Sequence, residues 1–395
     1  MLNHEAVPNR APVRSPRFRD EMVTSALPIG RARPPLYTGA RMTRSTRRAL
    51  RQLSALGVVA AIGASGCTCN RQRLPITGMA SSFTQPLVTK MLQTYDDPFT
   101  HVQLATLGPE ESARSKLLDH QVDYFATEGP VPLVGQPTLS SRPVVVPIAI
   151  GAVALVYDLP GVPSLSLSPD AVSAIYRGEA KTWDAPVIAA GNPGVALPSL
   201  PIDVVHRSDQ SSTTAIFAGY LATISPAWGA THPVGLTVQW PVGRGVDGPD
   251  AVVEAVRATP GATSFLALAG AVDAKLSIAS VGNASSRYVM PTIASMSAAA
   301  DGVDWPPGTP PPSLLARPGE GAYPICSLVY VVFDTSRLAG AQVTGIAAFL
   351  RYAIGDGQKL AAPLQFSPLP GRIVEAYAAG LDELQQDRSP PPPSP

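Results

Sequence analysis

The run of residues 143–159, PVVVPIAIGAVALVYDL, restricts the fold more than any other segment of the chain. Its first fifteen residues carry no charge, and the run is too rich in β-branched residues and proline to form one helix. A continuous apolar run of this kind is typical of a strand that is buried on both faces. We therefore predict a long buried strand here, which crosses between two domains.

Strand-like and helix-like runs alternate on either side of this segment, which is the pattern of an α/β protein. The part of the chain that alternates has roughly 320 residues, enough for about two domains. A proline-rich stretch at 305–318 reads as a connector between elements. The predicted strands cover 76–83 with its following loop, 101–107, 122–127, 202–206 and 325–334, and the predicted helices cover 84–95, 110–120, 170–178, 215–224, 250–258 and 342–355.

Charge is distributed unevenly along the chain. Residues 1–66 contain 11 Arg and only three acids, a net charge of +8, whereas residues 67–395 carry a net charge of −7. Such an asymmetry indicates a targeting segment or a binding tail. The acidic remainder argues against a nucleic-acid-binding protein, which would present a basic face. Three cysteines are too few for a disulfide scaffold or a zinc cluster.

The basic front end has the features of an export signal. Four arginines between positions 44 and 51 precede an uncharged stretch at 53–66, which is too short to span a bilayer but suits the apolar part of a signal peptide. Small residues directly before Cys67 resemble a bacterial lipobox, in which the cysteine is lipidated. We predict a leader at 1–41 that is disordered or lies upstream of the true start, a signal peptide at 42–66, a lipid anchor at Cys67 and a disordered proline-rich tail at 387–395.

Hydroxyl residues precede two of the predicted helices. One group is Ser81-Ser82 and the other is the run 211–214, SSTT, which follows Arg207 and Asp209. A helix N-terminus binds anions through its free N–H groups, and arginine offers a fork that matches a tetrahedral oxyanion. Asp209 can hold that fork in place. The pattern therefore favours an anion site, although plain helix capping by the same hydroxyls explains it as well.

Five ordered blocks between about Ile76 and Tyr377 carry a family resemblance. The blocks are ITGMASSF (76–83), VDYFATEGP (122–130), the long segment 175–221 that contains VVHRSDQSSTT, the segment 237–262 around WPVG and PGA, and GEGAYPICSLVYVV (319–332). They resemble the phosphate-binding proteins of bacterial phosphate ABC importers. The resemblance implies a type II periplasmic-binding-protein fold, with lobe I at 74–148 and 326–386 and lobe II at 149–325.

The resemblance also implies a set of ligand-binding residues. Ser82 and the Phe83 N–H match the donors of the family's first loop, and Arg207 matches its phosphate-binding arginine. Glu128 stands where the family has an aspartate that accepts a proton from the bound phosphate. The implied set is Ser82, Phe83, Glu128, Arg207, Asp209, Ser211, Ser212 and Thr213.

Several positions depart from the family pattern inside this set. Glu128 is longer than the family's aspartate, and Ser212 replaces a glycine. The family's glycine- and serine-rich loop after the second strand would fall at 107–112, where Glu110 either faces the cleft or begins the following helix. We favour the helix position, with Ser112 as a substitute donor.

The leading hypothesis is a lipid-anchored, extracytoplasmic protein that captures phosphate or a similar oxyanion for the permease and ATPase of an importer. It implies no catalysis, no cofactor, no metal, no nucleic acid, and membrane contact only through the lipid. One alternative is a secreted phosphoester hydrolase that uses Ser82 or Ser211 with His206 as the base. Another is a non-transporting lipoprotein whose anion site has degenerated.

Overall fold

The computed structural model describes residues 73–105, 115–129 and 143–386. The predicted leader, signal peptide, Cys67 anchor and proline-rich tail lie outside these ranges, as do Glu110 and Ser112. None of the helices in the described ranges is long and apolar enough to cross a membrane.

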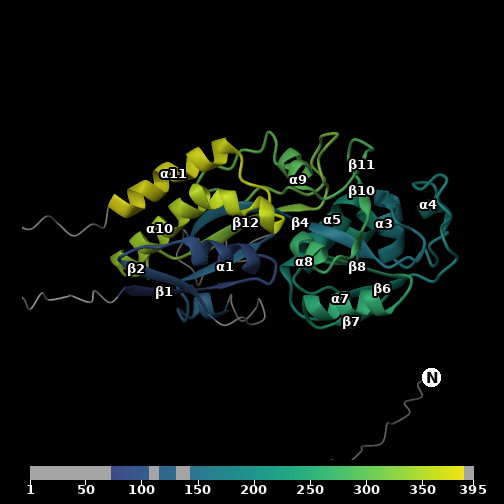
Figure 1. Cartoon of the computed structure of the whole chain (residues 1–395), viewed down its shortest axis with the longest axis horizontal. Helices are drawn as coiled ribbons and strands as arrows, with labels where there is room; N and C mark the ends of the chain where they lie inside the picture. Colours follow the sequence, from purple (N-terminus) through teal and green to yellow (C-terminus); the bar gives the residue numbers. More distant parts are fainter. Residues whose placement is uncertain (1–72, 106–114, 130–142, 387–395) are drawn as a thin grey trace, which may run out of the picture. The chain divides into compact units, whose positions relative to one another are not determined.

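A mixed nine-stranded sheet runs through the described residues, with the order β2-β1-β3-β12-β4-β8-β6-β7 and with β9 paired to β4 (Figure 1). Its outer strands pair in parallel, whereas β12 and β4 run antiparallel to their neighbours. The strands are β1 Leu74–Ala80, β2 Thr100–Leu104, β3 Tyr124–Glu128, β4 Val144–Tyr157, β6 Asp203–Arg207, β7 Arg244–Val246, β8 Ala262–Ala267, β9 Ser277–Ile278 and β12 Cys326–Phe333. A second, three-stranded sheet contains β5 Ser166–Leu167, β10 Ser280–Gly282 and β11 Tyr288–Val289.

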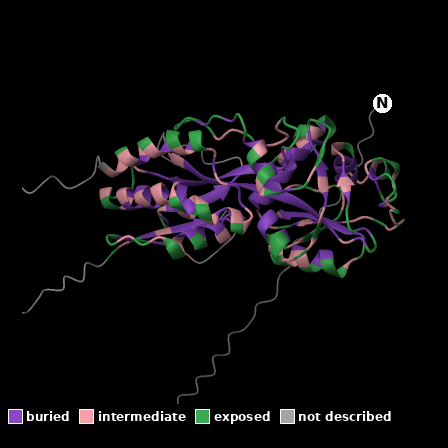
Figure 2. Cartoon of the chain, turned by 45° about the horizontal axis from the view of Figure 1, so that its top comes forward, coloured by how far each residue is buried: buried purple, intermediate pink, exposed green. Residues whose placement is uncertain are grey.

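The long apolar run forms one strand, β4, as its sequence predicts. All of its residues from Val146 to Tyr157 are buried, and Figure 2 shows the strands in the middle of the sheet as largely buried. The first part of β4 pairs with β12, and its last five residues pair with β8. One strand thus joins the β1–β3 side of the sheet to the β6–β8 side, which is the arrangement that the prediction of a crossing strand requires.

The predicted helices that lie in the described ranges are present. The 110–120 prediction is described only from residue 115, and residues 115–118 are helical. The prediction of a helix start at residue 215 is wrong by three residues, since α5 begins at Ser212. The helices are α1 Gln85–Thr94, α3 Pro169–Tyr176, α4 Pro186–Ala189, α5 Ser212–Ile224, α6 Pro226–Gly229, α7 Gly248–Ala258, α8 Leu268–Asp273, α9 Ile293–Ala299, α10 Gly340–Ile354 and α11 Gly371–Gln386, with 3-10 turns η1 Asp356–Leu360 and η2 Ala362–Leu364.

The parallel strands direct their carboxyl ends toward the loops that carry the sequence-predicted residues. β1 ends just before Ser82, β3 ends at Glu128, and β6 ends at Arg207. In open α/β sheets, ligands bind beyond the carboxyl ends of the strands. The topology therefore brings the carboxyl ends of β1, β3 and β6, which are far apart in the sequence, to the loops that carry the predicted ligand-binding residues.

Candidate oxyanion-binding site

A cleft of about 640 Å³ brings together four of the residues that the sequence singled out. Ser82 and Phe83 enter it from the loop between β1 and α1, Arg207 from the end of β6, and Thr213 from the first turn of α5. The rest of the lining comes from α7, β8, α8 and the start of α1. It includes the exposed charged side chains Asp250, Glu254, Arg257 and Asp273.

Arg207 is the buried cation of this cleft. Its side chain is only 6% exposed, and its Nε and Nη2 atoms both donate to the carboxylate of Asp209, the former at 2.5 Å to Oδ1. Asp209 also accepts a hydrogen bond from the Gly248 N–H at 3.1 Å, which ties it to the start of α7. Two hydrogen bonds fix the guanidinium plane. No described hydrogen bond uses its Nη1 atom, and Arg207 lines the cleft.

The pKa of Asp209 reflects two opposing effects. Burial raises the pKa, but the hydrogen bonds from Arg207 and the Gly248 N–H, together with the guanidinium charge, outweigh burial and hold the pKa below its usual range. Asp209 therefore remains ionised while it positions Arg207.

We expect this lowered pKa to appear as a pH-dependent difference in stability. A carboxyl whose folded-state pKa is depressed adds stability above its unfolded-state pKa of about 3.9, and that stability is lost as the pH falls through the folded-state pKa. At pH 7 the wild type should be more stable than Asp209→Asn by about 1–3 kcal/mol, the cost of weakening a partly buried charged pair. Denaturant titrations at pH 7 and pH 3 check this prediction, because the difference should shrink at pH 3. An equal difference at both values would contradict it.

The hydroxyl run at 211–214 forms the N-terminus of α5. Ser211 is the N-cap residue, and Ser212, Thr213 and Thr214 form the first turn rather than a loop before the helix. No side chain caps the helix, so its first N–H groups have no partner within it. The buried hydroxyls of Ser211 and Thr214 have no hydrogen-bond partner among the described residues. An unpaired buried hydroxyl costs about 1–3 kcal/mol, which favours a binding role for this helix start.

Glu128 lies at the end of β3 and is 2% exposed. It is not among the residues that line the cleft. Its carboxylate accepts hydrogen bonds from Ser81, Thr84 and Ser212, so Ser212 donates to Glu128 where the sequence predicted a ligand donor. Thr84 is the contributor that sequence reasoning missed, whereas Ser81 was noted as a hydroxyl before a predicted helix but was not placed in the ligand set. Their spacing of three residues at a helix start was the available signal.

Among the described residues, the contacts of His206 do not include either serine of the hydrolase alternative. His206 stacks on Trp240 with ring centroids 5.4 Å apart, and its Nδ1 lies 3.2 Å from the Arg207 carbonyl oxygen. Burial holds the pKa of His206 below its usual value, although the Arg207 carbonyl opposes this effect. No described hydrogen bond joins His206 to Ser82 or Ser211. Within the described ranges, no group of three or more His, Cys, Asp or Glu residues could hold a metal ion.

Comparisons with known proteins identify the family of this chain. A family described as a PBP superfamily domain matches residues 58–356. A phosphate-binding protein PstS of Xylella fastidiosa is 29% identical over 311 residues, which cover 77% of this chain and 85% of the relative. PstS 3 of Mycobacterium leprae is 30% identical over 284 residues, covering 68% of this chain and 76% of the relative. The chain therefore belongs to the PBP superfamily. Within that superfamily, its relatives are the PstS phosphate-binding proteins.

Solved structures confirm the fold class. A high-affinity periplasmic phosphate-binding protein called PfluDING, solved with bound phosphate, superposes with a TM-score of 0.63 and 19% identity, covering 78% of this chain and 93% of that one. A crystal structure of a DING protein gives a TM-score of 0.60 and 20% identity over 77% of this chain and 93% of that one. The chain has the type II periplasmic-binding-protein fold.

Proposed function

We propose that this chain is an exported solute-binding protein that captures inorganic phosphate, or a similar tetrahedral oxyanion, in the cleft at Arg207. The observation that carries this proposal is the buried Arg207, which Asp209 holds in one orientation while it lines the cleft. A fixed guanidinium that lines the same cleft as the first turn of an uncapped helix is suited to binding an oxyanion. The names of the PstS relatives support phosphate as the ligand.

The proposed ligand set keeps the residues of the sequence prediction but separates those that contact the anion from those that position or hold other side chains. Ser82, the Phe83 N–H, Arg207 and Thr213 line the cleft and are proposed to contact the anion directly. Asp209 orients Arg207, and Ser211 supplies a buried hydroxyl at the helix start. Glu128 and Ser212 contact each other, and their role is considered below.

The cellular setting is part of the same proposal. The loaded protein would deliver its ligand to a membrane permease driven by an ATPase, with lobe I at 74–148 and 326–386 and lobe II at 149–325 closing on the anion. The basic, apolar front end with Cys67 supports export and lipid anchoring. Binding without catalysis is consistent with relatives that are named as binding proteins.

Calorimetric titration of the purified chain with inorganic phosphate tests the proposal. We expect saturable binding of one phosphate per chain at micromolar or tighter affinity, and weaker binding of sulfate at the same ionic strength. Phosphatase activity with a phosphate ester should be absent. A folded chain that binds neither anion would overturn the proposal and leave the non-transporting lipoprotein as the better reading.

A further inference from the structure

The carboxylate of Glu128 is held by hydroxyl groups from two separate parts of the chain. The Ser81 and Thr84 hydroxyls donate to its Oε2 atom at 2.5 and 2.6 Å, and the Ser212 hydroxyl donates to Oε1. All four side chains are buried. A buried carboxylate requires several such donors, because burial removes its hydration.

These hydroxyls mark the starts of two helices. Ser81 and Thr84 lie in the loop that enters α1, and Ser212 is the first residue of α5. Neither helix has a side-chain cap at its N-terminus. Helix N-termini favour negative charge, and bound oxyanions commonly sit there. The Glu128 carboxylate thus lies against the starts of α1 and α5, the two helix N-termini that border the cleft.

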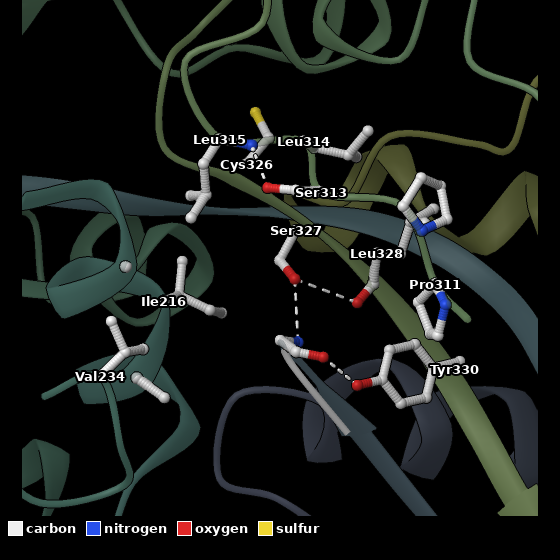
Figure 3. A pocket seen from close by; sticks show the side chains of 14 residues that line it. Ile216, Val234, Pro311, Ser313, Leu314, Leu315, Cys326, Ser327, Leu328 and Tyr330 are labelled. Carbon is white, nitrogen blue, oxygen red and sulfur yellow. Dashed lines mark hydrogen bonds between the residues drawn. The ribbon is translucent and has the colours of Figure 1, made fainter. Parts of the chain in front are cut away.

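The backbone beside Glu128 is held in place by β12. Figure 3 shows the Ser327 and Tyr330 side chains of this strand with the hydrogen bonds that they make, which include those to the residue that follows Glu128. The Gly129 N–H donates to the Ser327 hydroxyl at 2.9 Å, and the Tyr330 hydroxyl donates to the Gly129 carbonyl. Gly129 has a positive φ of 80°, which a side chain would strain. Any displacement of the carboxylate therefore has to come from the Glu128 side chain, not from its backbone.

We propose that Glu128 is an internal competitor of the captured oxyanion. Its carboxylate engages the hydroxyls of the α1 and α5 starts in the ligand-free protein, and an entering anion has to displace it or share those donors with it. This inference rests on the proposed function, since it concerns the two helix starts that border the proposed cleft. It opposes the role implied by the family resemblance, in which this residue accepts a proton from the ligand and so strengthens binding.

The substitution Glu128→Gln separates the two roles. It keeps the shape of the side chain but removes the charge that attracts the hydroxyl donors and repels an anion. Calorimetric titration of the full chain with inorganic phosphate at pH 8 should give a dissociation constant about tenfold lower than that of the wild type. A higher dissociation constant would instead show that Glu128 accepts a proton from the ligand, and an unchanged one would show that it does not compete; both results overturn the inference.

Glu375→Gln is the matched control. This substitution also removes one carboxylate charge, but Glu375 is exposed on α11 and does not line the cleft. Its substitution should change the phosphate dissociation constant by no more than about twofold, because exposed charges are screened. An equal gain in both variants would point to the overall charge of the protein and would contradict a specific role for Glu128.

Ser212→Ala provides a second variant in case Glu128→Gln folds poorly. It removes the hydroxyl that holds Oε1 and leaves the helix start otherwise intact, so phosphate affinity should rise by about threefold. Failure of the inference is distinguishable from failure of the proposed function. If the wild type binds phosphate and neither variant binds it more tightly, only the inference fails. If wild type and variants are folded and none binds phosphate, the proposed function fails as well.

Discussion

Replacing Arg207 with alanine should lower the affinity for phosphate by about two to four orders of magnitude. Hydrogen bonds to charged groups contribute about 1.5–3 kcal/mol each, and a guanidinium can offer two of them to one oxyanion. The substitution also leaves Asp209, its bidentate partner, as an uncompensated negative charge beside the cleft. Calorimetry with inorganic phosphate, together with a thermal melt to verify folding, measures the effect.

Arg244→Ala is the control for this result. Arg244 belongs to β7 beside β6, and its Nε donates to Asp203 at 3.1 Å, so it is an arginine–aspartate pair of the same sheet. The Arg244 side chain is 45% exposed and does not line the cleft. Its loss should leave phosphate affinity unchanged. Wild-type affinity in Arg207→Ala would place the oxyanion somewhere other than this cleft.

The sequence predicted the framework well where its signals were strong and local. β4 is visible as an uncharged β-branched run, and α10 is visible through its helical spacing of apolar residues. β8 was not predicted as a strand, although it is a central strand of the sheet. Its six residues, ATSFLA, are too few and too mixed to show a period, and their pairing with β4 and β6 decides their conformation.

In the site too, contacts between residues close in sequence could be predicted, whereas contacts between residues far apart in sequence could not. Arg207 and Asp209 are two residues apart, so their pairing could be expected from the motif alone. The contacts of Glu128 span 44 to 84 residues along the chain and depend on how β3, α1 and α5 pack. Sequence reasoning placed Glu128 and Ser212 in the site by position. It could not foresee that they would bind each other.

The second large effect is expected from Gly151→Ala, because Gly151 of β4 packs against Phe83, which lines the cleft. A Cβ atom at this position would lie 2.3 Å from Cε1 and 2.6 Å from Cζ of Phe83, whose ring packs edge-on against Phe366 with centroids 5.9 Å apart. Because Phe83 is buried and lines the cleft, Gly151→Ala has to push its ring and the loop that carries it. Overpacking of this kind costs about 1–3 kcal/mol. We expect a lower melting temperature and a phosphate affinity reduced by about tenfold.

Gly270→Ala is the control for this prediction. It tests whether the lower melting temperature and the weaker phosphate binding arise from the contact with Phe83 rather than from the loss of a glycine. Gly270 lies in α8 on the same cleft, but a Cβ atom there would meet nothing within 4 Å. Alanine favours a helix over glycine by about 1 kcal/mol, so this variant should melt no lower than the wild type and should bind phosphate equally well. If Gly151→Ala lowered stability but left phosphate affinity intact, Phe83 would support the core without positioning the ligand. A loss of both properties would instead show that β4 also sets the geometry of the cleft, since a methyl group at Gly151 would clash with Phe83, which lines the cleft.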